Sequence, residues 1–148
     1  MSGIPLLDVN LLVALAWPNH VHHRAAHAWF GSVHERGWAT CSITESGFVR
    51  VSSNPRATPE AKRPIEALHL LRALREVSGH VFWSDDVSLA ADSSVRLDRL
   101  AGHRQVTDQH LLCVALSHKG VLATFDRGVL DLVPESIRPD DALVLLEA

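Results

Sequence analysis

Leu6-Leu7-Asp8-Val9-Asn10 is the stretch of sequence that decides the fold. Residues 4–7 form a short apolar run that ends abruptly at Asp8, as expected of a buried first strand. Residues 10–17 then predict a short helix, which Pro18 and Asn19 end. A buried strand followed by a helix is the repeating unit of a layered α/β domain, and here it places Asp8 at the carboxyl end of the strand.

The same alternation of strand and helix continues along the chain. Thr44 is expected to cap a helix that runs to the break at residues 52–55. Further strands are predicted at residues 38–43, 80–83, 121–125 and 142–146, and further helices at residues 22–36, 59–77, 88–100 and 107–118. This order predicts a parallel sheet with helices on both faces, in one α/β domain spanning residues 1–148.

The helix predicted at residues 59–77 is the longest. Its apolar residues recur along one face, which predicts a core-facing stripe; the alternative is a groove for a partner helix. The stripe consists of Ile65, Leu68, Leu71, Leu74 and Val77.

The composition is that of a compact globular protein. Of the 148 residues, 47% are hydrophobic, enough for a single hydrophobic core. No apolar run approaches the roughly 18 residues of a membrane span, and the N-terminus lacks a secretory signal, so we expect no membrane association. Cys41 and Cys113 are far apart and predict buried thiols in a reducing compartment, the cytoplasm.

The charge distribution is uneven although the net charge is only −3. Residues 50–75 contain six basic and two acidic residues. A basic segment beside an acidic site suits a metal-dependent nuclease, because the cations bind phosphates while the acids hold the ion. The alternative is an ordinary solvated helix face. The candidate RNA contacts are Arg50, Arg56, Lys62 and Arg63.

Four acidic residues lie where predicted strands and helices meet: Asp8, Glu45, Asp108 and Asp126. The carboxyl ends of parallel strands share one edge of a sheet, where α/β proteins bind ligands. Carboxylates gathered there repel one another, and a cation compensates them. Oxygen ligands favour Mg²⁺ or Mn²⁺. The alternative is that each acid only caps a helix or forms a turn.

Three polar neighbours are candidates for an accessory role. Asn10 follows Asp8 by two residues and can orient a water or a phosphate oxygen. Thr107 and Thr124 are placed to hold the carboxylates that bind the ion.

The ordered set of motifs resembles the PIN-domain ribonucleases, and more narrowly the VapC-type toxins of toxin–antitoxin pairs. Asp8-Val9-Asn10-Leu11-Leu12 lies near the N-terminus, Thr44-Glu45 precedes a hydrophobic helix, Thr107-Asp108 opens a later helix, and Ala123-Thr124-Phe125-Asp126 follows a strand. The segment from His22 to Phe30 and Val133-Pro134 also fit. The resemblance implies a three-layer α/β/α sandwich in which Asp8, Glu45, Asp108 and Asp126 form the metal site, with Asn10 accessory.

The resemblance also implies an activity and partners. The expected activity is Mg²⁺- or Mn²⁺-dependent endoribonuclease cleavage, leaving a 5′ phosphate and a 3′ hydroxyl on a single-stranded or looped RNA. The expected partners are a cognate antitoxin, which blocks the site with a basic side chain, and a second copy of the chain in a homodimer. Many relatives carry a further acid and an aromatic where this chain has Gly128 and Val129, so the number of ions stays open.

Other functions are less well supported by the sequence. A PIN fold that binds RNA or protein without cutting would be favoured by loss of one of the four acids, and all four are present. His23 and His27 have the i, i+4 spacing of zinc ligands, but no nearby residue completes a set. A phospho-receiver domain would have paired acids after the first strand, and a haloacid dehalogenase-type phosphatase an Asp-x-Asp pair, which Asp8-Val9-Asn10 lacks.

Overall fold

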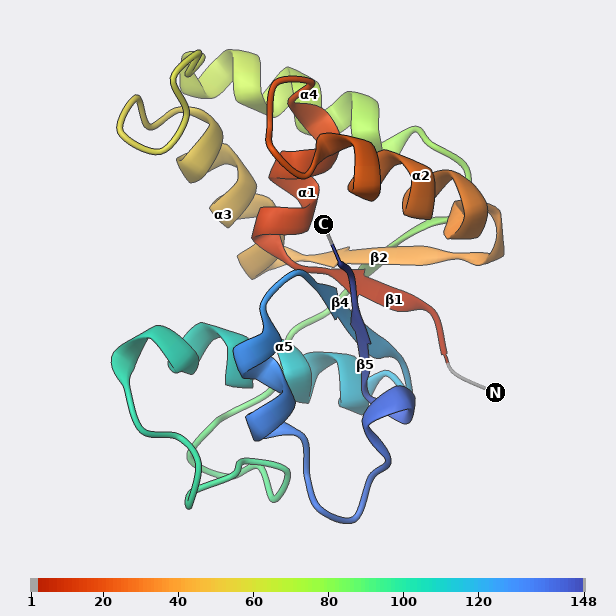
Figure 1. Ribbon diagram of the computed structural model, residues 1–148, viewed down its shortest axis with the longest axis vertical. Coiled ribbons are helices and arrows are strands. Elements are labelled where there is room, and N and C mark those ends of the chain that lie inside the picture. Colours follow the sequence, from red (N-terminus) through yellow and green to blue (C-terminus); the bar gives the residue numbers. More distant parts are fainter. Residues whose placement is uncertain (1–2, 148) are drawn as a thin grey trace.

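The computed structural model describes residues 3–147 and contains, within them, a central sheet of five parallel strands (Figure 1). The strands are β1 (Pro5–Leu7), β2 (Trp38–Cys41), β3 (His80–Trp83), β4 (Val121–Thr124) and β5 (Leu143–Leu145). Their order is β3-β2-β1-β4-β5. The predicted parallel sheet is confirmed. Residues 80–83 form a strand as predicted, and each of the other four strands is one or two residues shorter than its predicted range.

Helices cover both faces of the sheet, which confirms the three-layer α/β/α sandwich (Figure 1). One face carries α1 (Val9–Ala16), α2 (His23–Val33), α3 (Ser42–Ser52) and α4 (Pro64–Arg75). The other face carries α5 (Val106–Ser117) and the 3₁₀ helix η3 (Arg127–Leu132). Shorter 3₁₀ helices are η1 (His34–Arg36), η2 (His103–Gln105) and η4 (Pro139–Asp141). No helix among residues 3–147 is long and apolar enough to cross a membrane.

Successive strand residues pack into two separate cores. In β1, Leu6 packs in the core beneath α5, and Leu7 packs in the core beneath α1 and α2. Leu122 and Ala123 of β4 divide in the same way. Because side chains alternate across a strand, a strand covered on both faces must be apolar throughout. This explains why the strands appear in the sequence as continuous apolar runs.

The strand order reverses at β1. From β1 the chain builds β2 and β3 on one side, whereas β4 and β5 lie on the other. Leu7 of β1 pairs with Ala123 of β4, and the Asp8 amide donates to the Ala123 carbonyl at 3.0 Å. The carboxyl ends of these neighbouring strands therefore lie side by side at the switch point, where ligands bind in such sheets.

The prediction of a helix at residues 88–100 is wrong, because the structure has turns there. The carboxylates of Asp85 and Asp92 accept hydrogen bonds from backbone N–H groups two residues further on, at 3.2 and 2.7 Å, and these local bonds compete with a helix. The half-buried Arg96 then ties the segment down, donating to the Val133 carbonyl at 2.7 Å and pairing with Asp98 at 3.0 Å.

Two helix starts also differ from prediction. The helix expected from residue 59 begins only at Pro64, whose missing N–H suits the first helical position. The strand expected over residues 38–43 ends at Cys41, and α3 begins at Ser42. Thr44 is therefore not the cap but lies in the first turn, where its hydroxyl accepts from the Cys41 amide at 2.9 Å.

The apolar stripe predicted on α4 is only partly core. Leu71 is buried, but Ile65 and Leu68 are 49% and 37% exposed. Leu74 and Val77 pack, partly buried, against the same core as Leu71, and the small residue Ala67 is fully buried, so only the N-terminal part of the predicted stripe is exposed.

Candidate active site

Asp8 is the most buried of the four predicted acids, with 6% of its surface exposed. It caps α1, where its Oδ1 accepts from the Val9 amide at 2.7 Å. Its Oδ2 accepts from the hydroxyl of the fully buried Thr124 at 2.7 Å. Burial raises the pKa of Asp8; these two hydrogen bonds oppose the rise, and the charge of Asp126 adds to it. Asp8 is thus rigidly held but poorly solvated.

Asp126 follows β4 and caps η3. Its Oδ1 accepts from the Gly128 amide at 2.8 Å, and its own amide donates to the Thr124 hydroxyl oxygen at 3.1 Å. The Thr124 hydroxyl therefore accepts from Asp126 while it donates to Asp8. One buried side chain fixes the relative position of the two acidic residues.

Asp108 lies in the first turn of α5 and interacts with both of these acids. Its pKa is raised to about 7, first by burial, then by the negative charges of Asp8 and Asp126, and by a hydrogen bond to Asp126. A carboxyl group whose pKa is raised by like charges is one that a bound cation would help to ionise. The three carboxylates supply only oxygen donors, which fits Mg²⁺ or Mn²⁺.

Glu45 is not part of this group in the conformation described. Its Oε2 accepts from the Thr40 hydroxyl at 2.6 Å, and its Oε1 lies 3.4 Å from Nη1 of Arg75. It is not among the charges that shift the pKa of Asp8 or of Asp108. Across residues 3–147, no three His, Cys, Asp or Glu side chains are arranged closely enough to hold an ion. Asp8, Asp108 and Asp126 thus lie near enough for their charges to affect one another's surroundings, but in this conformation of the described residues they do not present three ligands to one ion, and Glu45 lies apart from them.

The other predicted accessory residues are exposed. Asn10 lines a pocket of about 310 Å³ together with Trp17, His20 and Thr58, and none of the four predicted acids lines this pocket. Neither Asn10 nor Thr107 makes a side-chain hydrogen bond to any residue that the structure describes. Both side chains are therefore available to a ligand.

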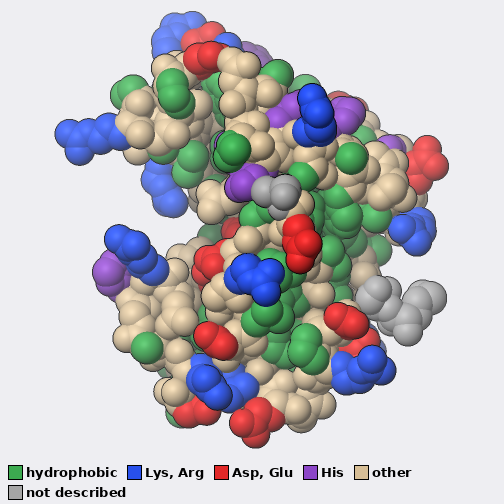
Figure 2. Space-filling model, in the orientation of Figure 1, with side chains coloured by type: hydrophobic (Ala, Val, Ile, Leu, Met, Phe, Trp, Pro, Cys, Tyr) green, Lys and Arg blue, Asp and Glu red, His purple; other side chains and the backbone are tan. Residues whose placement is uncertain are grey.

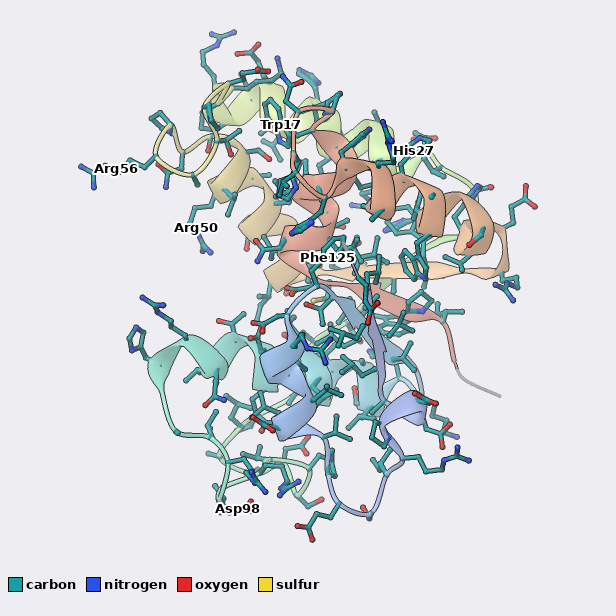
Figure 3. All side chains as sticks on the ribbon, in the orientation of Figure 1. Trp17, His27, Arg50, Arg56, Asp98 and Phe125 are labelled. Carbon is teal, nitrogen blue, oxygen red and sulfur yellow. The ribbon has the colours of Figure 1, made fainter. Side chains whose placement is uncertain are left out.

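The predicted basic residues are not equivalent. The surface is indented between the two halves of the molecule (Figure 2). Arg50 extends from α3 toward this side, whereas Arg56 points outward from the loop that follows (Figure 3). Arg63 pairs with Glu66 at 3.1 Å, and the Lys62 ammonium lies 5.8 Å from the centre of the Trp17 ring. Of the two that Figure 3 labels, Arg50 is thus the one directed toward the acidic side chains.

Two cationic residues were missed by sequence reasoning. Figure 2 shows acidic side chains in the indentation, with basic side chains on both sides of it. On the side opposite α3 lies η2, which carries the exposed Arg104 one helical turn before Asp108. That spacing is visible in the sequence. Arg75 could not have been found in this way, because it is thirty residues from Glu45.

The histidines do not form a zinc site in the part of the chain described. His23 bonds to the Ala14 carbonyl through Nδ1 at 2.8 Å and stacks obliquely on His27, with no third ligand nearby. His22 instead stacks on Phe125, their ring centres 4.6 Å apart, beside the acidic group.

Comparison with known proteins identifies the class. A profile of the PIN domain matches residues 6–135, which contain all four acids. The chain belongs to the PIN-domain family, as the resemblance predicted.

Relatives of the chain within the family include VapC proteins of Mycobacterium tuberculosis. Ribonuclease VapC39 is 48% identical over 126 residues, covering 85% of this chain and 91% of the relative. Ribonuclease VapC38 is 49% identical over 141 residues, covering 95% and 96%. Ribonuclease VapC44 is 44% identical over 130 residues, covering 87% and 91%. The chain is therefore a PIN domain of the VapC type.

Proposed function

We propose that this protein is a Mg²⁺- or Mn²⁺-dependent endoribonuclease and the toxin of a toxin–antitoxin pair. The observation that carries the proposal is the position of Asp8, Asp108 and Asp126 beside the switch point of a PIN-domain sheet, where the charges of Asp8 and Asp126 raise the pKa of Asp108. The matches to Ribonuclease VapC39 and Ribonuclease VapC38 each span more than nine tenths of the relative's length, and both relatives are named ribonucleases.

The acidic side chains of the site have different proposed roles in catalysis. A bound divalent ion supplies a water of lowered pKa and neutralises charge on the phosphate. Asp8 and Asp126 would hold it from strand ends, kept in place by Thr124 and by the Gly128 amide. Asp108, whose pKa is raised to about 7 by burial and by the charges of Asp8 and Asp126, would be ionised by the bound cation and would supply its third carboxylate. Glu45 would join them after a side-chain movement or through a water.

The proposed substrate and partners rest on the site together with the relationship to VapC-type proteins. A phosphodiester must be splayed out to reach a crevice at a sheet edge, so single-stranded or looped RNA is the expected substrate, cut to leave a 5′ phosphate and a 3′ hydroxyl. Arg50, Arg56, Lys62 and Arg63 are the proposed phosphate contacts. A cognate antitoxin would place a basic side chain among the acids, and the protein would act as a homodimer in the cytoplasm.

The test is growth on induced expression of the wild type and Asp8→Asn, with cellular RNA mapped for new 5′ ends. Asp140→Asn is the matched control, because Asp140 is an exposed acid on η4 that belongs to no part of the site. Arrest and discrete cuts are expected for the wild type and the control only. Equal cutting by Asp8→Asn would overturn the site, and no cutting by folded wild type would favour a PIN fold that binds RNA without cleaving it.

A further inference from the structure

Glu45 is held by a chain of hydrogen bonds that crosses the sheet. The hydroxyl of Thr40, on β2, donates to Oε2 of Glu45 at 2.6 Å. The same hydroxyl oxygen lies 2.8 Å from Nε2 of His80, on the neighbouring β3. A hydroxyl has one hydrogen, which goes to Glu45, so His80 must be the donor to Thr40 through Nε2–H. Thr40 is fully buried, and this side of the carboxylate is therefore firmly fixed.

The contact on the other oxygen is weaker. Nη1 of Arg75 lies 3.4 Å from Oε1 of Glu45, which is long for an ion pair between hydrogen-bonding groups. The Arg75 side chain is 42% exposed, and solvent screens such pairs. Its guanidinium also lies over the Phe82 ring, with Cζ 5.5 Å from the ring centre, so it keeps a second support if Glu45 leaves. Oε1 is therefore the oxygen of Glu45 that can exchange its partner at a small cost in free energy.

Glu45 would add a fourth carboxylate to the group formed by Asp8, Asp108 and Asp126. The charges of Asp8 and Asp126 raise the pKa of Asp108, whereas Glu45 is paired with Arg75 and is not among the charges that raise it. We propose that Arg75 competes with the divalent ion for Glu45: Arg75 holds Oε1 in the metal-free protein, and Glu45 exchanges it for the ion while Thr40 keeps Oε2. This rests on the metal-dependent function proposed above and makes Arg75 a positioning residue that sets the metal affinity.

The inference is tested by titrating Mn²⁺ into the purified full-length protein by calorimetry, without RNA. Arg75→Gln should tighten Mn²⁺ binding about 3- to 5-fold, the range that corresponds to loss of a competing exposed ion pair. Arg72→Gln is the matched control, because Arg72 lies one turn earlier on α4, is exposed and has no ion pair among the described residues. Its effect should stay below about 1.5-fold, as expected of a screened charge.

A double-mutant cycle with Glu45→Gln separates competition from a general field effect. In the Glu45→Gln background, Arg75→Gln should no longer tighten Mn²⁺ binding. A gain that persists without Glu45, or an Arg75→Gln effect equal to that of Arg72→Gln, would overturn the competition. Because both arginines are exposed, circular dichroism melting should show every variant folded like the wild type.

The same titration keeps the two proposals apart. Asp8→Asn should weaken Mn²⁺ binding at least about tenfold if the acidic group holds the ion. Binding unaffected by Asp8→Asn would place the ion elsewhere and refute the proposed metal site. Binding that depends on Asp8 and Glu45 but not on Arg75 would refute only the competition. No binding to the wild type would overturn both.

Discussion

Thr124 connects two acidic residues through one hydroxyl group: it donates to the Asp8 carboxylate and accepts from the Asp126 amide. Because Thr124 is fully buried, no water can replace these bonds. Without the hydroxyl, the Asp8 carboxylate would keep only the Val9 amide as a hydrogen-bond partner. Thr124 thus helps to keep the Asp8 carboxylate ionised and correctly oriented, although Thr124 itself need not contact the substrate.

Thr124→Val should therefore lower both stability and cleavage. The isosteric change leaves a buried carboxylate oxygen unsatisfied, which costs about 1–3 kcal/mol of unfolding free energy. Urea unfolding at pH 7.5 measures this loss, and an RNA cleavage assay measures the effect on activity. Thr124→Ser keeps the hydroxyl and should retain most of both. A valine variant as stable and active as the serine variant would show that the bond is dispensable.

Asp108 makes the metal-free protein less stable as the pH rises. Its pKa is 3.8 in the ordinary state and about 7 in the folded protein, so between these values the folded state binds a proton that the unfolded state does not. Folding stability therefore falls as the pH rises through this window and is lowest above pH 7. Asp108 therefore lowers the folding stability of the protein above pH 7, and such a loss of stability is common at functional sites.

Asp108→Asn should raise the melting temperature in EDTA, by a few degrees at pH 8 and by less at pH 5. Added Mn²⁺ should then stabilise the wild type more than the variant, because the ion relieves the repulsion that the substitution has already removed. Thermal melts at both pH values measure this, with Asp140→Asn as the exposed control. An equal shift at pH 5 and pH 8 would contradict the assigned repulsion.

At the scale of elements, α1 and α3 approach each other closely at Gly47. A Cβ at this position would lie 2.6 Å from Cγ2 of Val9, the residue that follows Asp8. Glycine is thus required here by packing, although it disfavours a helix. Gly31 in α2 is the opposite case, since a Cβ there would have no heavy atom within 4 Å.

Gly47→Ala should destabilise the protein by about 1–3 kcal/mol, because the stiff Val9 side chain must move. Gly31→Ala should instead stabilise it by up to about 1 kcal/mol through helix propensity alone. Chemical unfolding of the two variants tests the difference in sign. Two stabilising substitutions would mean that α1 and α3 can separate freely.

The elements show why prediction succeeded in some places and failed in others. Strands buried on both faces appear as apolar runs, so the sheet and the acids Asp8 and Asp126 at its edge were predictable. The turns of residues 84–102 were not, because they depend on side-chain bonds such as that of Arg96 to the Val133 carbonyl. The position of Glu45 depends on Arg75 and Thr40, which belong to other elements, and no local pattern contains that information.

At the scale of the whole molecule, a net charge of −3 conceals an acidic indentation with cations at its margins. Arg50 extends toward this indentation, whereas Arg56 extends away from it (Figure 3). A phosphate chain passing over the acids from the α3 side would pass Arg50. The two residues carry the same charge and both are exposed, so their comparison separates position from net charge.

Arg50→Gln should therefore weaken binding of single-stranded RNA and reduce the slope of log K against log salt concentration by about 0.7, the value for one phosphate contact. Arg56→Gln should change the slope by much less, although it removes the same charge. Binding is measured by fluorescence anisotropy in EDTA, in the Asp8→Asn background, so that the RNA stays intact. Equal effects of the two substitutions would mean that RNA responds to the overall basic segment, as the sequence suggested, rather than to a path across the acids.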